Sequence, residues 1–324
     1  MKAVLCKSFG GPENLVIEEV EDLTPEEGQV IISVKAAGLN FPDTLIIQGK
    51  YQFQPDLPFS PGGEVAGVVK SVGTGVEGLK PGDRVMSGTS WGGLAEEVRA
   101  RASNTFIIPE QMSYEQAAAS LMTYATSIHA LKDRGQLKAG ETVMVLGAGG
   151  GIGVASIQLA KLMGAKVIAC ASTDEKLDFC RSIGADHTIN YKKEDLKSRA
   201  KEITDGQGVD VIVDPVGGDY AEAAFRSIAR FGRYLVVGFA SGQIPRLPFN
   251  LPLLKSASIV GVFWGSLFRN DVNQNRENVA QLLEWFESGE LESVIYHSYP
   301  LDQYEAAMKA LLNQEVKGKI VLIA

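Results

Sequence analysis

A glycine-rich loop stands between a short apolar strand and an amphipathic helix near the middle of the chain. The segment from Thr142 to Gly164 reads TVMVLGAGGGIGVASIQLAKLMG, and five of the seven residues from Gly147 to Gly153 are glycine. Glycine permits a sharp turn from strand to helix, and it lets backbone N–H groups approach a pyrophosphate without interference from a Cβ. The positive end of the helix that follows attracts the phosphates. This order of elements therefore predicts a dinucleotide-binding unit.

The flanking residues favour this interpretation over a glycine-rich hairpin or linker. Before the loop, Val143 to Leu146 is an apolar segment rich in β-branched residues. After the loop, the apolar residues of the helix stay largely on one side, and they are Ile152, Ala155, Ile157, Leu159 and Leu162. A strand before the loop and a helix after it are the context that the dinucleotide motif requires.

The end of the next strand indicates which dinucleotide binds. That strand is Lys166 to Ala171, and an NAD-binding unit normally ends it with an Asp or Glu that holds the adenosine ribose hydroxyls. Here that position is Ala171. Two hydroxyls and an ammonium, from Ser172, Thr173 and Lys176, follow where a 2′-phosphate would lie. The sequence therefore favours NADPH over NADH.

An alternative explains the same charges as helix chemistry. Asp174, Glu175 and Lys176 would then be only the charged first turn of the following helix, with Asp174 as its N-cap. This alternative explains Asp174 but not the missing acid at Ala171.

Composition and charge exclude several classes of protein. The chain has 324 residues, 45% of them hydrophobic and 22% charged, which predicts a globular protein of two domains. A net charge of -8 without a Lys/Arg-rich run disfavours nucleic acid and anionic membranes as main partners. No segment is apolar for the roughly 18 residues that a membrane span needs, and the first residues, MKAVLCKSFGGPE, lack the apolar core of a signal peptide. Three cysteines without a CxxC pair, Cys6, Cys170 and Cys180, fit buried thiols in a reducing compartment, so we expect a cytoplasmic protein.

Short strands separated by Gly/Pro turns occupy the chain up to about residue 122 and predict a β-rich, barrel-like domain. The expected strands are Ala3 to Leu5, Leu15 to Glu19, Gln29 to Ala37, Gly62 to Gly73, Arg84 to Met86 and Leu94 to Ala100. A helix from about Tyr114 to Leu131 is expected next.

Strictly alternating strands and helices follow, which predicts an α/β domain with a doubly wound parallel sheet and helices on both faces. The expected segments are a strand from Thr142, a helix from Ile152, a strand at Lys166 to Ala171, a helix at Glu175 to Ser182, a strand at His187 to Ile189, a helix at Lys193 to Ile203, a strand at Val209 to Asp214, a helix from Tyr220, and strands near Tyr234 to Val237 and Ser258 to Val262. Beyond about residue 266, helices at Val279 to Phe286 and Leu301 to Leu312 and a strand at Lys319 to Ile323 are expected to return to the first domain.

With these domains in this order, the chain resembles the medium-chain dehydrogenase/reductase superfamily over essentially its whole length. The most specific segments are AAGLNFPDTLIIQGKY (Ala36 to Tyr51), PGGEVAGVVKSVGTGVEGLKPGDRV (Pro61 to Val85) and the loop GAGGGIG followed by AKLMGAKVIA. Within the superfamily the chain is similar to the zinc-free quinone oxidoreductase branch. The resemblance implies a GroES-like catalytic domain over residues 1–122, completed by 266–324, and a Rossmann domain over residues 123–265. It also implies a homodimer in which edge strands pair.

The chain differs from the zinc alcohol dehydrogenase branch at its metal ligands. Asn40 stands where that branch has a cysteine, Gly63 stands where it has the histidine before Glu64, and the four-cysteine lobe after Val98 is absent. A catalytic zinc needs about three Cys, His or carboxylate ligands. The histidines are expected to be packed or surface imidazoles, and they are His129, His187 and His297. We therefore expect no metal and interpret Glu64 as a structural carboxylate.

The resemblance assigns the groups that meet the substrate to the segment from Asn40 to Tyr51. Tyr51 matches a tyrosine that related enoyl reductases use as a proton donor, and Asn40 is the second expected donor. Asp43 ranks lower because a carboxylate would repel a forming enolate. Alternatively, Tyr51 only packs within an aromatic, proline-rich loop.

The resemblance also implies the cofactor contacts. Thr123 is expected at the nicotinamide amide. Ser172, Lys176 and Tyr191 are expected at the 2′-phosphate, with a simple surface aromatic as the alternative for Tyr191. The residues expected around the pyrophosphate are Gly147, Gly150, Gly151, Ile152 and Gly153. The loops after the fifth and sixth strands are expected to face the nicotinamide half, through Gly238, Phe239, Ser241, Phe263, Trp264 and Gly265. An aromatic pair at a subunit contact is the alternative for Phe263 and Trp264.

Without zinc, alcohol oxidation is disfavoured because both a Lewis acid and a general base would have to be replaced. Conjugate reduction needs only a bound cofactor, a hydrogen bond to the substrate oxygen and a proton. The resemblance implies NADPH-dependent reduction of quinones or α,β-unsaturated carbonyls. The alternatives are a reductase of enoyl thioesters such as acryloyl-CoA, and a non-catalytic NADPH-binding protein.

Overall fold

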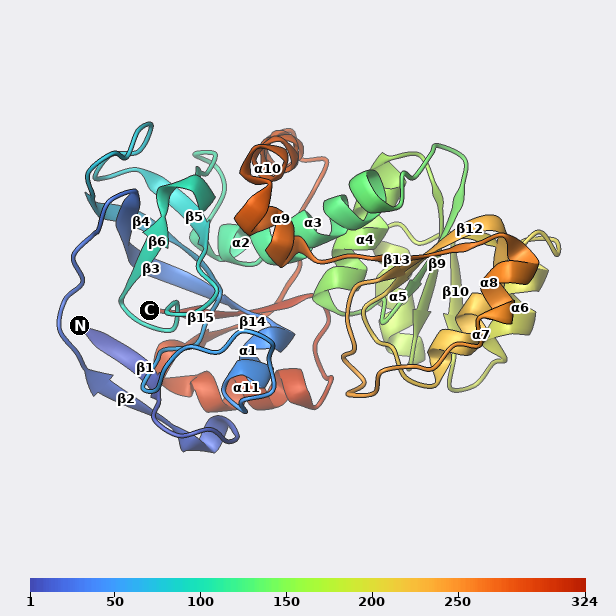
Figure 1. The fold of residues 1–324 in the computed structure, drawn as a ribbon, viewed down its shortest axis with the longest axis horizontal. Coiled ribbons are helices and arrows are strands. Elements are labelled where there is room, and N and C mark those ends of the chain that lie inside the picture. The colour runs from blue at the N-terminus through green and yellow to red at the C-terminus, as the bar shows by residue number, and fades with distance from the viewer. The chain divides into compact units, whose positions relative to one another are not determined.

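The chain forms two compact units in a computed structural model that describes residues 1–324 (Figure 1). The first unit consists of Met1–Met122 and Asn270–Ala324, and the second of Thr123–Arg269. Both termini therefore belong to the first unit. None of the helices combines the length and the apolar character that a membrane span requires.

The first unit is built on a sheet in which most neighbouring strands are antiparallel. Its strands are β3 (Gln29–Leu39), β4 (Glu64–Val72), β5 (Arg84–Gly88), β6 (Glu97–Arg101), β7 (Thr105–Ile107), β14 (Ile295–Pro300) and β15 (Lys319–Ile323). The order is β14-β15-β3-β4-β5-β7, and β6 also pairs with β3. Two more strands, β1 (Lys2–Cys6) and β2 (Leu15–Glu19), form a separate antiparallel pair. Because β15 pairs with β3, the end of the chain lies beside the strand that leads into the candidate site.

Short helices flank this sheet. They are α1 (Phe41–Ile46), α2 (Tyr114–Ala118), α10 (Val272–Glu287) and α11 (Tyr304–Leu312), with 3-10 turns η1 (Pro12–Asn14), η2 (Ala102–Asn104) and η4 (Leu301–Gln303). Helix α1 begins directly after β3, because the Asp43 carboxylate accepts a hydrogen bond from the Asn40 N–H at the helix start and Pro42 fits the first turn. The core of the unit contains buried apolar residues from these strands and from α11.

The second unit contains a six-stranded sheet whose neighbouring strands are all parallel. Its strands are β8 (Thr142–Leu146), β9 (Lys166–Ala171), β10 (His187–Asn190), β11 (Val209–Asp214), β12 (Ile228–Val236) and β13 (Ser258–Gly261). The order is β10-β9-β8-β11-β12-β13, so the direction of winding reverses between β8 and β11. Doubly wound sheets bind ligands at that reversal, beyond the carboxyl ends of the strands. The predicted doubly wound sheet is confirmed.

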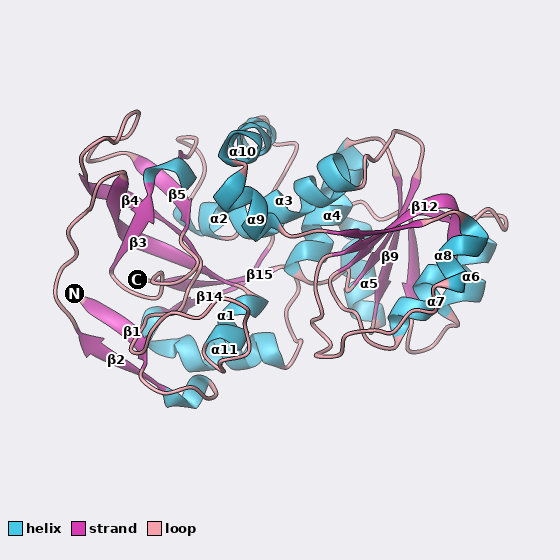
Figure 2. Cartoon of the chain, viewed as in Figure 1, coloured by secondary structure: helices cyan, strands magenta, loops and turns pink.

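Helices cover both faces of this sheet. The helices of this unit are α3 (Leu121–Ile128), the π-helical segment η3 (His129–Arg134), α4 (Gly151–Leu162), α5 (Asp174–Ser182), α6 (Leu196–Ile203), α7 (Tyr220–Arg226) and α8 (Asn250–Lys255). A further helix, α9 (Trp264–Asn270), follows β13 and ends at the boundary with the first unit. In Figure 2 the strands run between α4 and α5 on one side and α7 and α8 on the other.

The three cysteines, Cys6, Cys170 and Cys180, are buried and form no disulfide.

The predicted single helix from Tyr114 to Leu131 is wrong. The structure divides it into α2, α3 and η3, with the first break at residues 119–120. There the Ser120 hydroxyl donates to the Gln116 carbonyl in place of the Ser120 N–H, which bonds to the Ala117 carbonyl at 3.2 Å, so the α-helical pattern of hydrogen bonds is interrupted. Asp174 as an N-cap is also wrong, because Thr173 caps α5 by accepting a hydrogen bond from the Lys176 N–H.

Candidate functional site

The glycine loop of the second unit presents the start of a helix without a side-chain cap. Gly150 is the N-cap of α4 and makes no side-chain cap hydrogen bond to the first N–H groups of that helix. A Cβ on Gly153 would lie 2.5 Å from the Ala148 Cα, and a Cβ on Gly147 would lie 2.7 Å from the Val216 side chain. Glycine is therefore needed here for close packing, and the open N–H groups of α4 fit a phosphate group.

The groups expected at a 2′-phosphate come together at the ends of β9 and β10. The Tyr191 ring, just after β10, lies 4.1 Å from that of Tyr220, and Ser172 is near enough to the Tyr191 hydroxyl to act on its pKa. Burial raises the pKa of Tyr191 to about 12, so this phenol stays protonated and can donate to an anion. The side chain of Lys176 lies against Gly149, where an added Cβ would be 3.2 Å from Lys176 Cδ. Tyr191 is thus not the simple surface aromatic of the alternative interpretation.

The charge of Asp174, at the start of α5, is compensated by its neighbours. The Asp174 carboxylate accepts a hydrogen bond from Asn190 Nδ2 at 2.6 Å and pairs with the Lys193 ammonium. The Lys193 hydrogen bond, followed by that of Asn190, lowers the pKa of Asp174. Its negative charge is therefore directed toward β10 and its ammonium partner.

Two loops near the glycine loop are fixed to each other by Asp214, which the sequence analysis missed. This buried carboxylate, at the end of β11, accepts hydrogen bonds from the N–H groups of Val216 and Gly217, both at 2.8 Å, and from the Tyr234 hydroxyl. The Val216 carbonyl accepts a hydrogen bond from the Ser241 N–H at 3.0 Å. Because Val216 also packs on Gly147, Asp214 holds the expected nicotinamide loop, with Gly238, Phe239 and Ser241, beside the glycine loop.

The two remaining segments expected at the cofactor are the loop after β13 and Thr123, and their residues differ in exposure. Trp264 is buried and its ring lies 5.0 Å from that of Phe268, so it packs within α9. Phe263 is 41% exposed, and a Cβ on Gly265 would lie 2.8 Å from its ring. Thr123 is buried at the point where the chain enters the second unit.

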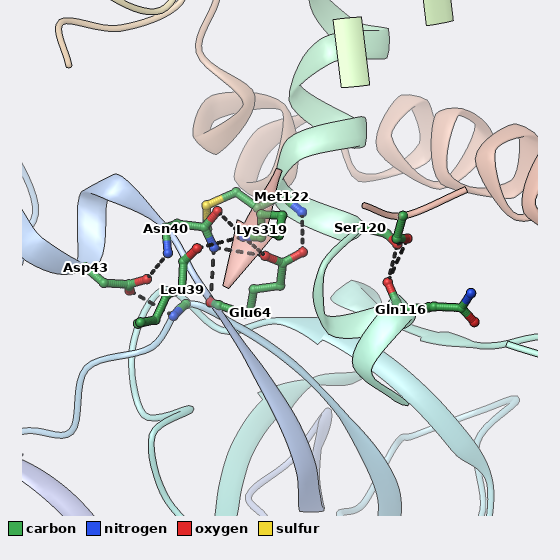
Figure 3. Close-up of polar contacts among 11 residues, drawn as sticks. Leu39, Asn40, Asp43, Glu64, Gln116, Ser120, Met122 and Lys319 are labelled. Carbon is green, nitrogen blue, oxygen red and sulfur yellow. Dashed lines mark hydrogen bonds and ion pairs between the residues drawn. The ribbon is translucent and has the colours of Figure 1, made fainter. Parts of the chain in front are cut away.

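A buried polar network occupies the first unit at the end of β3 (Figure 3). It joins Asn40, Asp43, Glu64 and Lys319, and all four side chains are less than 8% exposed. Glu64 Oε1 accepts a hydrogen bond from the Met122 N–H at 2.8 Å, and Glu64 Oε2 lies 2.9 Å from Asn40 Nδ2 and 3.0 Å from Lys319 Nζ. Asp43 accepts hydrogen bonds from the N–H groups of Asn40 and Gly63. Every buried charge here has a partner of suitable chemistry.

The amide of Asn40 is fully used by this network. Its Nδ2 donates to Glu64 and, at 3.2 Å, to the Gly38 carbonyl, and its Oδ1 accepts from Lys319 Nζ at 2.6 Å. An amide has two N–H donors, so neither is left for a substrate. Of the three expected catalytic residues, the structure brings Asn40 and Asp43 together through their polar groups.

Tyr51 lies in the loop after α1. Its half-buried ring packs against the apolar core of the first unit, 6.5 Å from the ring of Phe53 in a T-shaped arrangement. A phenylalanine could make the same apolar contacts, so these contacts alone do not require the hydroxyl.

Burial raises the pKa of Asp43 to about 6, although its hydrogen bonds and the Lys319 ammonium act in the opposite direction. A pKa raised from 3.8 to about 6 corresponds to about 3 kcal/mol. Because the native state binds this proton more tightly than the unfolded state, the contribution of Asp43 to stability falls as the pH rises from about 4 to about 6.

We therefore expect the free energy of unfolding of the native chain, measured against that of an Asp43→Asn variant, to fall by about 2 kcal/mol between about pH 4 and about pH 6. Urea unfolding of both chains at several pH values checks it. The comparison is needed because other carboxyls, such as Asp186 with its lowered pKa, act in the opposite direction. A difference that does not change with pH would contradict the assignment.

Comparison with known proteins places these features in a family. The alcohol dehydrogenase GroES-like domain family matches residues 26–110, and the zinc-binding dehydrogenase family matches residues 151–288. The quinone oxidoreductase-like protein 2 homolog of Nematostella vectensis is 41% identical over 99% of this chain and 88% of its own length. The chain belongs to the quinone oxidoreductase branch of the medium-chain dehydrogenase/reductase superfamily.

Other members of the quinone oxidoreductase branch match over the full length. Human quinone oxidoreductase is 33% identical over 100% of this chain and 98% of its own. The Escherichia coli quinone oxidoreductase, solved in complex with NADPH, has a TM-score of 0.93 and 31% identity, with 100% of both chains covered. The expected family and the expected fold, a GroES-like domain with a Rossmann domain, are confirmed.

The side chains of this chain do not fit the zinc ion that the name of the zinc-binding dehydrogenase family implies. Gly63 has no ligand atom in its side chain, Asn40 is bonded to Lys319, and both oxygens of Glu64 already accept hydrogen bonds. No group of three or more His, Cys, Asp or Glu side chains is arranged to hold a metal ion. A catalytic zinc site takes three such ligands.

Proposed function

We propose that the chain is an NADPH-dependent oxidoreductase that reduces quinones or α,β-unsaturated carbonyls without a metal ion. The observation that carries the proposal is the chemistry that follows β9 and β10. Ala171 stands at the position of the acid of NAD-binding units, and Ser172, Lys176 and Tyr191 come after the two strands. The NADPH in the complex of the Escherichia coli relative supports the same cofactor.

In this proposal the second unit binds the cofactor. The pyrophosphate lies on the open N–H groups of α4, with Gly147, Gly150, Gly151, Ile152 and Gly153 around it. The 2′-phosphate contacts Ser172, Lys176 and Tyr191. Thr123 and the loops after β12 and β13 meet the nicotinamide half, and Asp214 keeps the first of these loops in position. When bound, NADPH supplies the hydride.

The first unit supplies the proton in this proposal. Tyr51 is the donor, because it carries a phenol in the segment that the family resemblance assigns to the substrate. Asn40 and Asp43 act by positioning, since the amide of Asn40 is committed to Glu64, Gly38 and Lys319, and Asp43 fixes the start of α1. A hydride and a proton together reduce either a quinone or the double bond of an enone.

Steady-state rates with NADPH and three acceptors test the function. The acceptors are 1,4-naphthoquinone, a simple enone and acryloyl-CoA, and we expect turnover of the first two. Turnover of acryloyl-CoA alone would favour an enoyl-thioester reductase. Tight NADPH binding without turnover of any acceptor would favour a non-catalytic role and would contradict the proposal.

Metal independence gives a separate prediction. Treatment with EDTA or 1,10-phenanthroline is expected to leave the NADPH-dependent rate unchanged, because the chain offers no set of three free ligands around Glu64. Elemental analysis of the purified protein is the matching measurement. One zinc per chain, or loss of activity that zinc restores, would refute this part of the proposal.

A homodimer is the proposed assembly. Strand β13 is an edge of the parallel sheet, and Ile259 on it is 41% exposed. Phe249, the N-cap of the neighbouring helix α8, and Leu253 and Leu254 within that helix are 86%, 77% and 73% exposed. Apolar residues beside an unpaired edge strand favour pairing with the same surface of a second copy around a two-fold axis.

We expect light scattering to give twice the chain mass of 34.8 kDa, and the Leu253→Glu, Leu254→Glu double variant to give the monomer mass. The reason is that two carboxylates would be buried without partners in each half of the interface. A control variant, Leu312→Glu, changes an exposed leucine of the first unit. A native chain that runs as a monomer at micromolar concentration would remove the proposed dimer.

A further inference from the structure

The Lys319 ammonium is buried among oxygens at the start of β15. Lys319 is 5% exposed, and its Nζ lies 2.6 Å from Asn40 Oδ1, 2.8 Å from the Leu39 carbonyl and 3.0 Å from Glu64 Oε2. An ammonium has three N–H donors, so all three are satisfied. The side chain thus lies in a small oxygen-lined site and not along the surface.

This cation compensates negative charge that has no access to water. Glu64 is fully buried and Asp43 is 2% exposed. Asp43 interacts electrostatically with both Glu64 and Lys319. Burying a carboxylate without a counter-charge is strongly unfavourable, and removing one partner of a buried pair leaves the other charge uncompensated. Two carboxylates and one ammonium therefore depend on one another here.

The same cation fixes two segments that the proposed function uses. Through Asn40 it holds the end of β3, from which α1 and the Tyr51 loop continue. Through Glu64 it holds the Met122 N–H, and Met122 is followed directly by Thr123. The Lys319 ammonium, which is distant in sequence, therefore positions both the end of β3 and the backbone at Met122.

We propose that the Lys319 ammonium serves as the built-in cation of this site. It compensates the buried negative charge and holds the surrounding oxygens by hydrogen bonds, as a metal ion would, and in this way it positions Asn40 and Glu64. Lys319 is a positioning residue and not a catalytic one. Its removal leaves an oxygen-lined cavity that accepts a primary alkylammonium ion, because such an ion carries the charge and the N–H donors of the missing side chain.

Chemical rescue tests the proposal. Lys319→Ala removes three carbons and the nitrogen, which is the composition of propylammonium. We expect the variant to show at least about a tenfold larger unfolding equilibrium constant and a lower rate, and propylammonium to reverse both with saturation. Tetramethylammonium has the charge but no N–H donor, and we expect it to have no effect. Lys35→Ala, at an exposed lysine of β3, is the matched control.

A double-mutant cycle covers the case in which Lys319→Ala does not fold. Lys319→Met keeps most of the volume, and we expect Glu64→Gln to suppress its instability, because the double variant has no uncompensated charge at this pair. Instability that adds up across the two substitutions, or a folded Lys319→Ala that propylammonium does not rescue, would overturn the proposal. These unfolding measurements use neither cofactor nor acceptor, so their outcome is independent of that of the proposed function.

Discussion

Replacement of Tyr51 by phenylalanine is expected to lower the turnover of an enone by about 10²- to 10⁴-fold, which is the usual contribution of a positioned general acid. An enone must gain a proton from a donor as the hydride arrives, whereas a quinone oxygen can take its proton from water. Turnover of 1,4-naphthoquinone should therefore fall much less. The measurement is kcat for both acceptors at saturating NADPH.

Phenylalanine preserves the packing of Tyr51 against the apolar core of the first unit, so a loss of rate reports the hydroxyl. The control is Tyr299→Phe, since Tyr299 packs against the same core from β14 and has no proposed role in the reaction. Equal rates for wild type and Tyr51→Phe on both acceptors would make Tyr51 a packing residue.

Replacement of Lys176 by alanine is expected to raise KM for NADPH by about 10- to 100-fold and to leave KM for NADH nearly unchanged. Hydrogen bonds to charged groups are worth about 1.5–3 kcal/mol, and about 1.4 kcal/mol is a factor of ten. Only NADPH carries the 2′-phosphate that this ammonium would meet. The ratio of the two KM values is therefore the readout.

The control for Lys176→Ala is Lys166→Ala, because Lys166 is an exposed lysine at the opposite end of β9 from Ser172. It changes the net charge by the same amount and leaves the proposed phosphate site intact. If Lys176→Ala raised both KM values equally, the 2′-phosphate assignment would fail.

Local signals explain which parts of the fold the sequence could predict. The strands at Leu15–Glu19, Val209–Asp214 and Lys319–Ile323 have the bounds that were expected, because each is a compact run of strand-forming residues between turn residues. The glycine loop was found because its chemistry lies within a few consecutive residues. Strand β14 was missed, since its sequence, IYHSYP, is mostly exposed and polar in character.

The polar network of the first unit shows what single-sequence reasoning could not reach. Lys319 was read only as the first residue of a strand, and its partners lie 255 to 280 residues away in the chain. Glu64 was expected to be structural, but nothing near it in sequence indicated its counter-ion. Asn40 was expected to donate to the substrate on the family resemblance alone. Its contact with Lys319 could not be foreseen, because it depends on the pairing of β15 with β3.

Asp214 was missed for a similar reason. In the sequence it ends an apolar strand, and its neighbours do not indicate what it bonds to. In the structure it gathers the N–H groups of Val216 and Gly217 and the hydroxyl of Tyr234, which comes from the next strand. The one available signal was its place at the carboxyl end of a strand in a doubly wound sheet.

Calorimetric titration of the purified chain with NADPH and, separately, with NADH tests the central claim most directly. The account predicts saturable binding of one NADPH per chain, with an affinity at least about tenfold higher than that for NADH, because only NADPH engages Ser172, Lys176 and Tyr191. No saturable heat with either coenzyme, or equal affinities for the two, would contradict it.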